Sequence, residues 1–155
     1  MKLLLHFFSW KSCFVITICL LPLLMFFSFY GLYTNNFYFL KIDNYIFPML
    51  ALIHFTFLHT LWKASKEGTS ENKTTRNFEF VMYGIYLIYL FKFTETIYIL
   101  LGYFDYSYLI IPPTFLPMGF TILGMQLLLL VITMLTFQHR KIHVGIYNFD
   151  RINDI

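Results

Sequence analysis

The chain has 155 residues and a formal net charge of +3, and 59% of its side chains are hydrophobic while only 12% are charged. Soluble domains are usually about 45–50% apolar and about 25% charged, and the mean hydropathy here is +0.67. This composition excludes a soluble globular domain, a disordered chain and a disulfide-stapled secreted domain, and the scattered basic residues exclude a nucleic-acid partner, so the sequence predicts an integral membrane protein.

Four apolar segments are long enough to be membrane spans, because about 20 apolar residues cross about 30 Å of hydrocarbon. We predict spans over residues 12–33, 44–62, 80–104 and 115–137. Open sheets do not span a bilayer, so the segments are expected to be helices. The predicted fold class is therefore all-α, a single domain of four transmembrane helices with short loops, followed by a basic and polar tail over residues 138–155.

Basic residues alternate between the two ends of the predicted spans. They occur in the N-terminal flank, in the loop over residues 63–79 and in the C-terminal flank. On the other side, the loop over residues 34–43 has Lys41 against Asp43, and the loop over residues 105–114 has no basic residue. The positive-inside rule places the basic side in the cytoplasm or in the mitochondrial matrix. Both termini are predicted on that side, as an even number of spans requires. The membrane is expected to be the mitochondrial inner membrane or the endoplasmic reticulum, which share this charge rule.

The third span contains two charged side chains at a depth where charges are rare. Lys92 lies about 18 Å into the span at about 1.5 Å per residue, and a lone charge near the midplane costs at least about 2.5–3.5 kcal/mol. Glu95 follows at i+3 and shares a helix face with Lys92, so the two are predicted to pair. We expect Gln126 of the fourth span at a similar depth and His54 of the second span somewhat closer to the basic side.

These four residues, Lys92, Glu95, Gln126 and His54, form the predicted intramembrane polar cluster. Two interpretations of the cluster stay open. In the functional one, it is a proton or ion relay, or a site for a polar ligand. In the structural one, it is an ion pair with hydrogen-bonded neighbours that fixes the rotation of a helix or docks a partner subunit.

Histidine spacing argues against a metal or haem site. His54 and His59 lie about 140° apart around a helix, so one helix does not present both to the same metal or haem. His139 and His143 are at i, i+4, a spacing that can bind zinc, but with the adjacent basic residues we interpret them as a headgroup anchor. No cofactor and no metal site is predicted.

Enzyme motifs are missing from the sequence, which has no HExxH, GxSxG, P-loop or GxGxxG pattern. No catalytic residue and no soluble small-molecule substrate is therefore predicted. The leading expectation is a non-catalytic accessory subunit of a larger membrane complex, for example of the respiratory-chain type, whose partners are the lipid bilayer and other membrane subunits. The alternative is a small transporter or channel component built on Lys92 and Glu95, and the third interpretation is a lipid-handling membrane protein of the endoplasmic reticulum.

Overall fold

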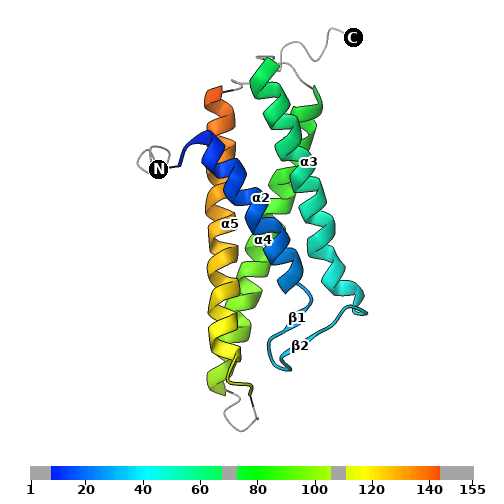
Figure 1. Cartoon of the computed structure of the whole chain (residues 1–155), viewed down its shortest axis with the longest axis vertical. Coiled ribbons are helices and arrows are strands. Elements are labelled where there is room, and N and C mark those ends of the chain that lie inside the picture. Colours follow the sequence, from blue (N-terminus) through cyan, green and yellow to red (C-terminus); the bar gives the residue numbers. More distant parts are fainter. Residues whose placement is uncertain (1–7, 68–72, 106–110, 144–155) are drawn as a thin grey trace.

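The computed structural model describes residues 8–67, 73–105 and 111–143 of the chain. In these ranges it is an all-α bundle with four helices long and apolar enough to cross a membrane, so the predicted fold class is confirmed (Figure 1). The chain is an integral, multi-pass membrane protein. The helices are α2 (Trp10–Phe27), α3 (Ile46–Glu67), α4 (Lys73–Asp105) and α5 (Phe115–His143).

The helices run alternately in opposite directions, and each packs against two neighbours in a ring. α2 contacts α3 and α5, and α4 also contacts α3 and α5. The beginnings of α2 and α4 therefore lie at the same end of the bundle as the ends of α3 and α5 (Figure 1). We call this the basic end, because Lys66, Arg76, Arg140 and Lys141 belong to these helix termini. The opposite end is the hairpin end.

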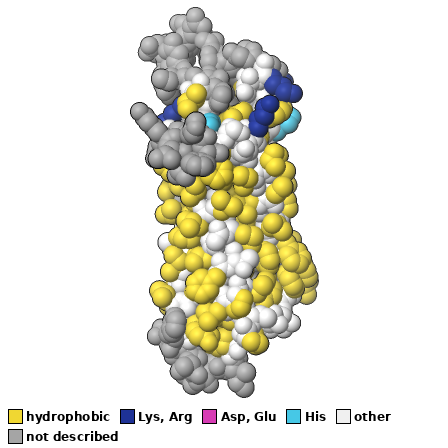
Figure 2. All heavy atoms as spheres, turned by 60° about the vertical axis from the view of Figure 1, so that its left-hand side comes forward, with side chains coloured by type: hydrophobic (Ala, Val, Ile, Leu, Met, Phe, Trp, Pro, Cys, Tyr) yellow, Lys and Arg dark blue, Asp and Glu magenta, His cyan; other side chains and the backbone are white. Residues whose placement is uncertain are grey.

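Large apolar side chains fill the centre of the bundle and also cover its outside. Phe137 of α5 packs against Phe57, Tyr83 and Tyr86, with ring centroids 5.9, 4.9 and 6.3 Å away. Figure 2 shows a broad zone of hydrophobic side chains across the middle of the molecule, with Lys and Arg gathered near one end. An apolar exterior of this kind suits contact with the acyl chains of a bilayer.

The first helix is shorter than the predicted first span. α2 ends at Phe27, whereas the sequence predicted a span up to residue 33. Two short antiparallel strands follow, β1 (Tyr30–Gly31) and β2 (Asn36–Phe37), with Tyr30 opposite Phe37. The 3-10 turn η1 (Ile42–Tyr45) then leads into α3.

The hairpin turn explains why the helix stops there. Asn35 adopts a left-handed conformation with φ 53°, which asparagine tolerates better than most residues. The backbone N–H of Asn35 donates to the Gly31 carbonyl at 2.9 Å, and that of Tyr38 donates to the Phe29 carbonyl at 2.8 Å. Residues 12–33 are uncharged and long enough to cross a bilayer, so the whole segment was predicted as a span. In the structure, the last part of that segment forms a turn.

The fourth helix is longer than the predicted fourth span. α5 continues to His143, so the first residues of the predicted polar tail over 138–155 are helical. His139 and Arg140 are only 6% and 4% exposed. They are buried because they have partners on other parts of the bundle, as described below. The rest of the predicted tail, residues 144–155, lies outside the described residues.

Candidate functional site

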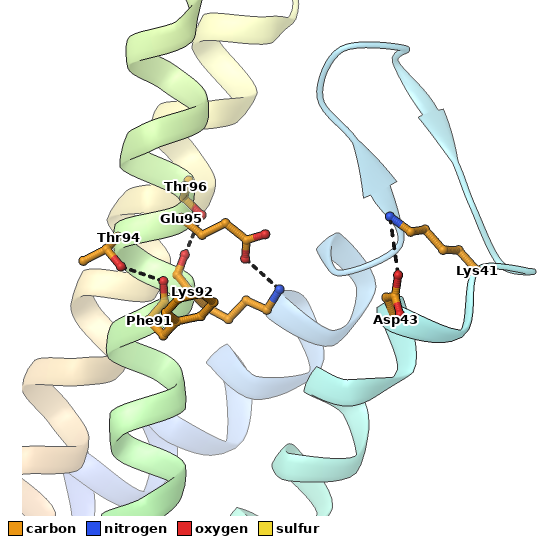
Figure 3. A network of polar contacts seen from close by, with 7 residues as sticks. All are labelled: Lys41, Asp43, Phe91, Lys92, Thr94, Glu95 and Thr96. Carbon is orange, nitrogen blue, oxygen red and sulfur yellow. Dashed lines mark hydrogen bonds and ion pairs between the residues drawn. The ribbon is translucent and has the colours of Figure 1, made fainter.

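Lys92 and Glu95 form an ion pair on α4. The Lys92 Nζ lies 2.7 Å from Glu95 Oε2, and the two side chains are 36% and 41% exposed. The Thr96 hydroxyl donates to the Lys92 carbonyl at 3.0 Å, within the same stretch of helix. In Figure 3 both charged side chains point from α4 toward the end of α2 and the beginning of α3. The pair therefore lies in a partly open place on the inner side of α4.

A cavity of about 100 Å³ lies beside Lys92, where all four helices contribute to the lining. Gln126 of α5 lines this cavity together with Lys92, so the structure brings these two predicted residues together. The Gln126 Oε1 is buried and has no hydrogen-bond partner in the described part of the chain. We call this space the inner cavity; its polar lining is Ser28, Asp43, Asn44, Lys92 and Gln126, and its apolar lining is Leu24, Phe27, Phe47 and Ile122.

The last turn of α2 forms one wall of the inner cavity. Ser28 caps the helix: its N–H donates to the Leu24 carbonyl at 2.9 Å. Its hydroxyl lies 2.7 Å from the Met25 carbonyl and 3.0 Å from the Asn44 carbonyl, either of which can accept its proton. The last turn of α2 has no basic residue of its own, so the Lys92 ammonium supplies positive charge at the negative end of this helix dipole.

A wider depression of about 460 Å³ lies between the hairpin and α4. We call it the outer depression; its lining includes Tyr30, Tyr33, Lys41, Asn44 and Ile99. The Tyr33 hydroxyl donates to the Ile99 carbonyl at 3.2 Å and so ties the hairpin to α4. Asn44 lines both spaces, which therefore adjoin at this residue.

A second charged pair lies near the outer depression. Lys41 Nζ is 3.8 Å from Asp43 Oδ2, and these side chains are 61% and 75% exposed. Figure 3 shows this pair at the hairpin side, facing the region that Lys92 and Glu95 enter from α4. Lys41 and Lys92 are therefore each paired with a carboxylate, Asp43 and Glu95.

His54 is not brought into the same place as the other predicted residues. It is fully buried, and it does not line the inner cavity. Its Nδ1 lies 3.4 Å from the Tyr89 hydroxyl, a long contact, and its ring centroid is 5.9 Å from that of Tyr89. The His54 Nε2 has no hydrogen-bond partner within the described ranges. The structure thus separates His54 from the group formed by Lys92, Glu95 and Gln126.

Sequence reasoning missed the ion pair of Glu79 and Arg140, which is more deeply buried than the Lys92–Glu95 pair. Arg140 Nη2 of α5 lies 2.5 Å from Glu79 Oε1 of α4, and the side chains are 5% and 2% exposed. The Tyr83 hydroxyl donates to the same carboxylate oxygen at 2.7 Å. Glu79 lies at the end of the loop over residues 63–79 and Arg140 in the predicted tail, just outside the predicted spans. The signal was their position: they have opposite charge and lie on the same predicted side, at the ends of neighbouring antiparallel helices.

His139 has a structural contact at the basic end. Its Nε2–H donates to the Phe8 carbonyl at 2.8 Å, and its ring lies 6.0 Å from that of Trp10. The side chain of His143 lies outside what the structure describes, so the proposed anchor pair is seen only in part. Over the described ranges, no three His, Cys, Asp or Glu side chains are grouped so that they could hold a metal ion.

Comparison of the chain with protein-family models, with curated proteins and with solved structures found no match. Chemically, the inner cavity is lined by the N–H donors of Lys92, whereas the Gln126 Oε1 is buried.

Proposed function

We propose that the chain is a non-catalytic accessory subunit of a larger membrane complex, for example an assembly of the respiratory-chain type. One observation carries this proposal: two glycines leave notches on the outside of neighbouring helices. Gly84 on α4 and Gly124 on α5 are exposed, and a Cβ added to either would meet nothing within 4 Å. Small residues on an outward face let the backbone of another membrane helix approach closely, which favours helix association.

Bulky side chains project from the surface around both notches. Phe80, Leu87 and Phe91 near Gly84 are 55%, 65% and 66% exposed. Phe120 and Leu127 near Gly124 are 60% and 50% exposed. Alanine is rare in this chain, with residues only at positions 51 and 64. A notch between large side chains supports docking by a helix of another subunit, and a uniform lipid-facing surface has no need of one.

The test fills the notches without disturbing the bundle. Gly84→Leu and Gly124→Leu add side chains into open space, and each replaces a residue that is about 1 kcal/mol worse than alanine in a helix interior. The variant chains should therefore fold, yet they should lose migration with a large species on a native gel after mild detergent extraction from the native membrane. Thr56→Leu, on the exposed face of α3, is the matched control and should migrate as the unaltered chain does. Unchanged migration of both glycine variants would count against the subunit proposal.

A second candidate, a small transporter or channel component, is favoured by the inner cavity beside Lys92. A charged side chain within a membrane-spanning helix, next to a polar cavity, is a common feature of ion and proton pathways. The test reconstitutes the purified chain alone in vesicles and measures proton and cation flux. Flux that disappears in the double variant Lys92→Met with Glu95→Gln supports this candidate, and absence of flux in the unaltered chain rejects it. Locating a tagged chain in mitochondria or in the endoplasmic reticulum then narrows which complex or pathway is involved.

A further inference from the structure

We propose that the hairpin segment, residues 28–45 between α2 and α3, is seated on the lipid surface at the hairpin end, with the side chains of Leu40 and Ile42 inserted into the acyl chains. The segment is thus a membrane-contacting element and not a loop in water. It is distinct from the glycine notches on α4 and α5, so the proposal goes beyond the subunit role. Helix length, exposed apolar side chains, backbone hydrogen bonds and charge each contribute to the argument.

The lengths of the two flanking helices place the hairpin segment at the edge of the hydrocarbon. Lys11 is exposed at the beginning of α2, and Lys63 is exposed near the end of α3, so both mark the membrane boundary at the basic end. From Lys11 to Phe27, α2 rises about 24 Å, and from Lys63 back to Ile46, α3 rises about 26 Å, at about 1.5 Å per residue. The hydrocarbon is about 30 Å thick. The chain therefore leaves α2 and enters α3 close to the opposite boundary (Figure 1).

Exposed apolar side chains continue from α3 into the hairpin segment. Leu40 and Ile42 are 99% and 84% exposed, more than any other large apolar side chain that the structure describes. Ile46 and Met49, also exposed, follow Ile42 at i+4 and i+7, a spacing that keeps side chains on one face of a helix. The candidate membrane span that contains α3 already begins at Ile42. The lipid-facing side of α3 is therefore continuous with the hairpin segment.

The backbone around Leu40 makes hydrogen bonds within the hairpin segment. The Asn44 side-chain amide donates to the Tyr38 carbonyl at 2.9 Å, and the Tyr45 hydroxyl donates to the Phe39 carbonyl at 2.9 Å. The Asn44 N–H donates to the Lys41 carbonyl at 3.1 Å. Irregular backbone does not face lipid within the hydrocarbon core, where unpaired polar groups are costly. Internal partners for these three carbonyls suit a backbone at the boundary, from which only the apolar side chains reach the acyl chains.

Charge favours a lipid surface over another protein as the partner. Lys41 and Asp43 alternate with Leu40 and Ile42 along the chain, and they form an ion pair at 3.8 Å with both side chains mostly exposed. The core of a protein interface is depleted in charged residues, whereas the membrane interface accommodates a charged head above an apolar stem. Exposed tyrosines at positions 33, 38 and 45 of the same segment are typical of the aromatic belt at that depth.

The first experiment measures depth in phosphatidylcholine vesicles. In a chain with Cys13→Ala and Cys19→Ser, nitroxide labels are attached to Leu40→Cys, to Asn36→Cys in β2 and to Leu52→Cys on the exposed side of α3. Collisions with oxygen, which is enriched among acyl chains, are compared with collisions with a neutral aqueous nickel chelate. The oxygen-to-nickel ratio at Leu40→Cys should be severalfold higher than at Asn36→Cys and should approach that at Leu52→Cys. Equal ratios at Leu40→Cys and Asn36→Cys would overturn insertion, and Ile42→Cys replaces Leu40→Cys if that variant does not fold.

The second experiment distinguishes lipid from a protein partner. A benzophenone maleimide attached to Leu40→Cys is irradiated in the native membrane, and the adducts are analysed by gel mobility and by mass. The expected product carries the added mass of a phospholipid and keeps the mobility of the unaltered chain. A discrete protein adduct at Leu40→Cys would overturn the lipid assignment and indicate a docked subunit instead. Gly84→Cys, in the notch on α4, is the comparison position, and by the separate subunit proposal it should give a protein adduct.

Discussion

Breaking the buried pair of Glu79 and Arg140 should destabilise the bundle much more than removing it. Arg140→Met leaves the Glu79 carboxylate 2% exposed without its guanidinium, and Glu79→Gln leaves the Arg140 cation 5% exposed without its acid. Removing one partner of a buried ion pair typically costs about 3–5 kcal/mol, whereas replacing both partners is often neutral or stabilising. Each single variant should therefore lose about 3–5 kcal/mol of the free energy of unfolding, and the double variant should recover most of it.

The pair of Lys92 and Glu95 is the internal comparison. Its side chains are 36% and 41% exposed, so solvent screens their interaction, and solvated pairs contribute about 0.2–1 kcal/mol. Lys92→Met and Glu95→Gln should each change the free energy of unfolding by no more than about 1 kcal/mol. The two ion pairs that involve α4 are thus expected to differ severalfold in the cost of losing one partner.

The assay is reversible unfolding in mixed micelles, followed by tryptophan fluorescence. Trp10 and Trp62 both report on the packed state, because their ring centroids lie 4.7 and 5.5 Å from that of Phe14. Arg140→Met within about 0.5 kcal/mol of the unaltered chain, the range of ordinary surface substitutions, would refute the burial argument. A loss for Lys92→Met as large as for Arg140→Met would refute the claim that water reaches the Lys92 pair.

Three further predictions follow from packing, backbone geometry and topology. Phe57→Ala should cost about 3–5 kcal/mol in unfolding free energy, because this fully buried ring leaves a cavity, whereas Phe91→Ala, on the lipid-facing side, should cost far less in the same assay. Asn35→Val should destabilise by about 1–2 kcal/mol, because a β-branched residue is strained in the left-handed region, and Asn35→Gly should not; equal stability of the two would contradict the turn. Cysteines introduced as Lys41→Cys and Lys66→Cys should be labelled from opposite sides of a sealed membrane, with the latter on the cytoplasmic or matrix side, and labelling of both from one side would contradict the four-span arrangement.

The number of spans could be predicted from composition, because lipid selects long apolar helices whatever their neighbours are. The end of α2 was not predicted, since apolarity alone does not distinguish a helix from an aromatic hairpin. Gly31 and the pair Asn35–Asn36 carried the missing information as turn-forming residues. The end of α5 was not predicted for the opposite reason: charge suggested a solvated tail, but Arg140 finds Glu79 inside the bundle.

The sequence could predict only those contacts of the candidate site that depend on position along a single helix. The i, i+3 pair of Lys92 and Glu95 needs no knowledge of other helices. Gln126 reaches the same cavity because depth along a span follows from the rise per residue. His54 does not, because depth says nothing about how a helix is rotated about its axis, and its ring faces Tyr89 instead.

The early end of α2 connects the fold to the site. Its 18 residues span about 27 Å at about 1.5 Å per residue, so it is the shortest of the four helices. A longer α2 would continue past the inner cavity, which its last residues now line. Because it stops at Phe27, the side chains of Lys92 and Glu95 enter this space from α4 (Figure 3). The carbonyl end of α2 favours the Lys92 cation there, and the segment between β2 and α3 places Lys41 and Asn44 at the outer depression. One shortened helix therefore creates both the space and the electrostatic environment in which a charged pair can exist within a membrane-spanning bundle.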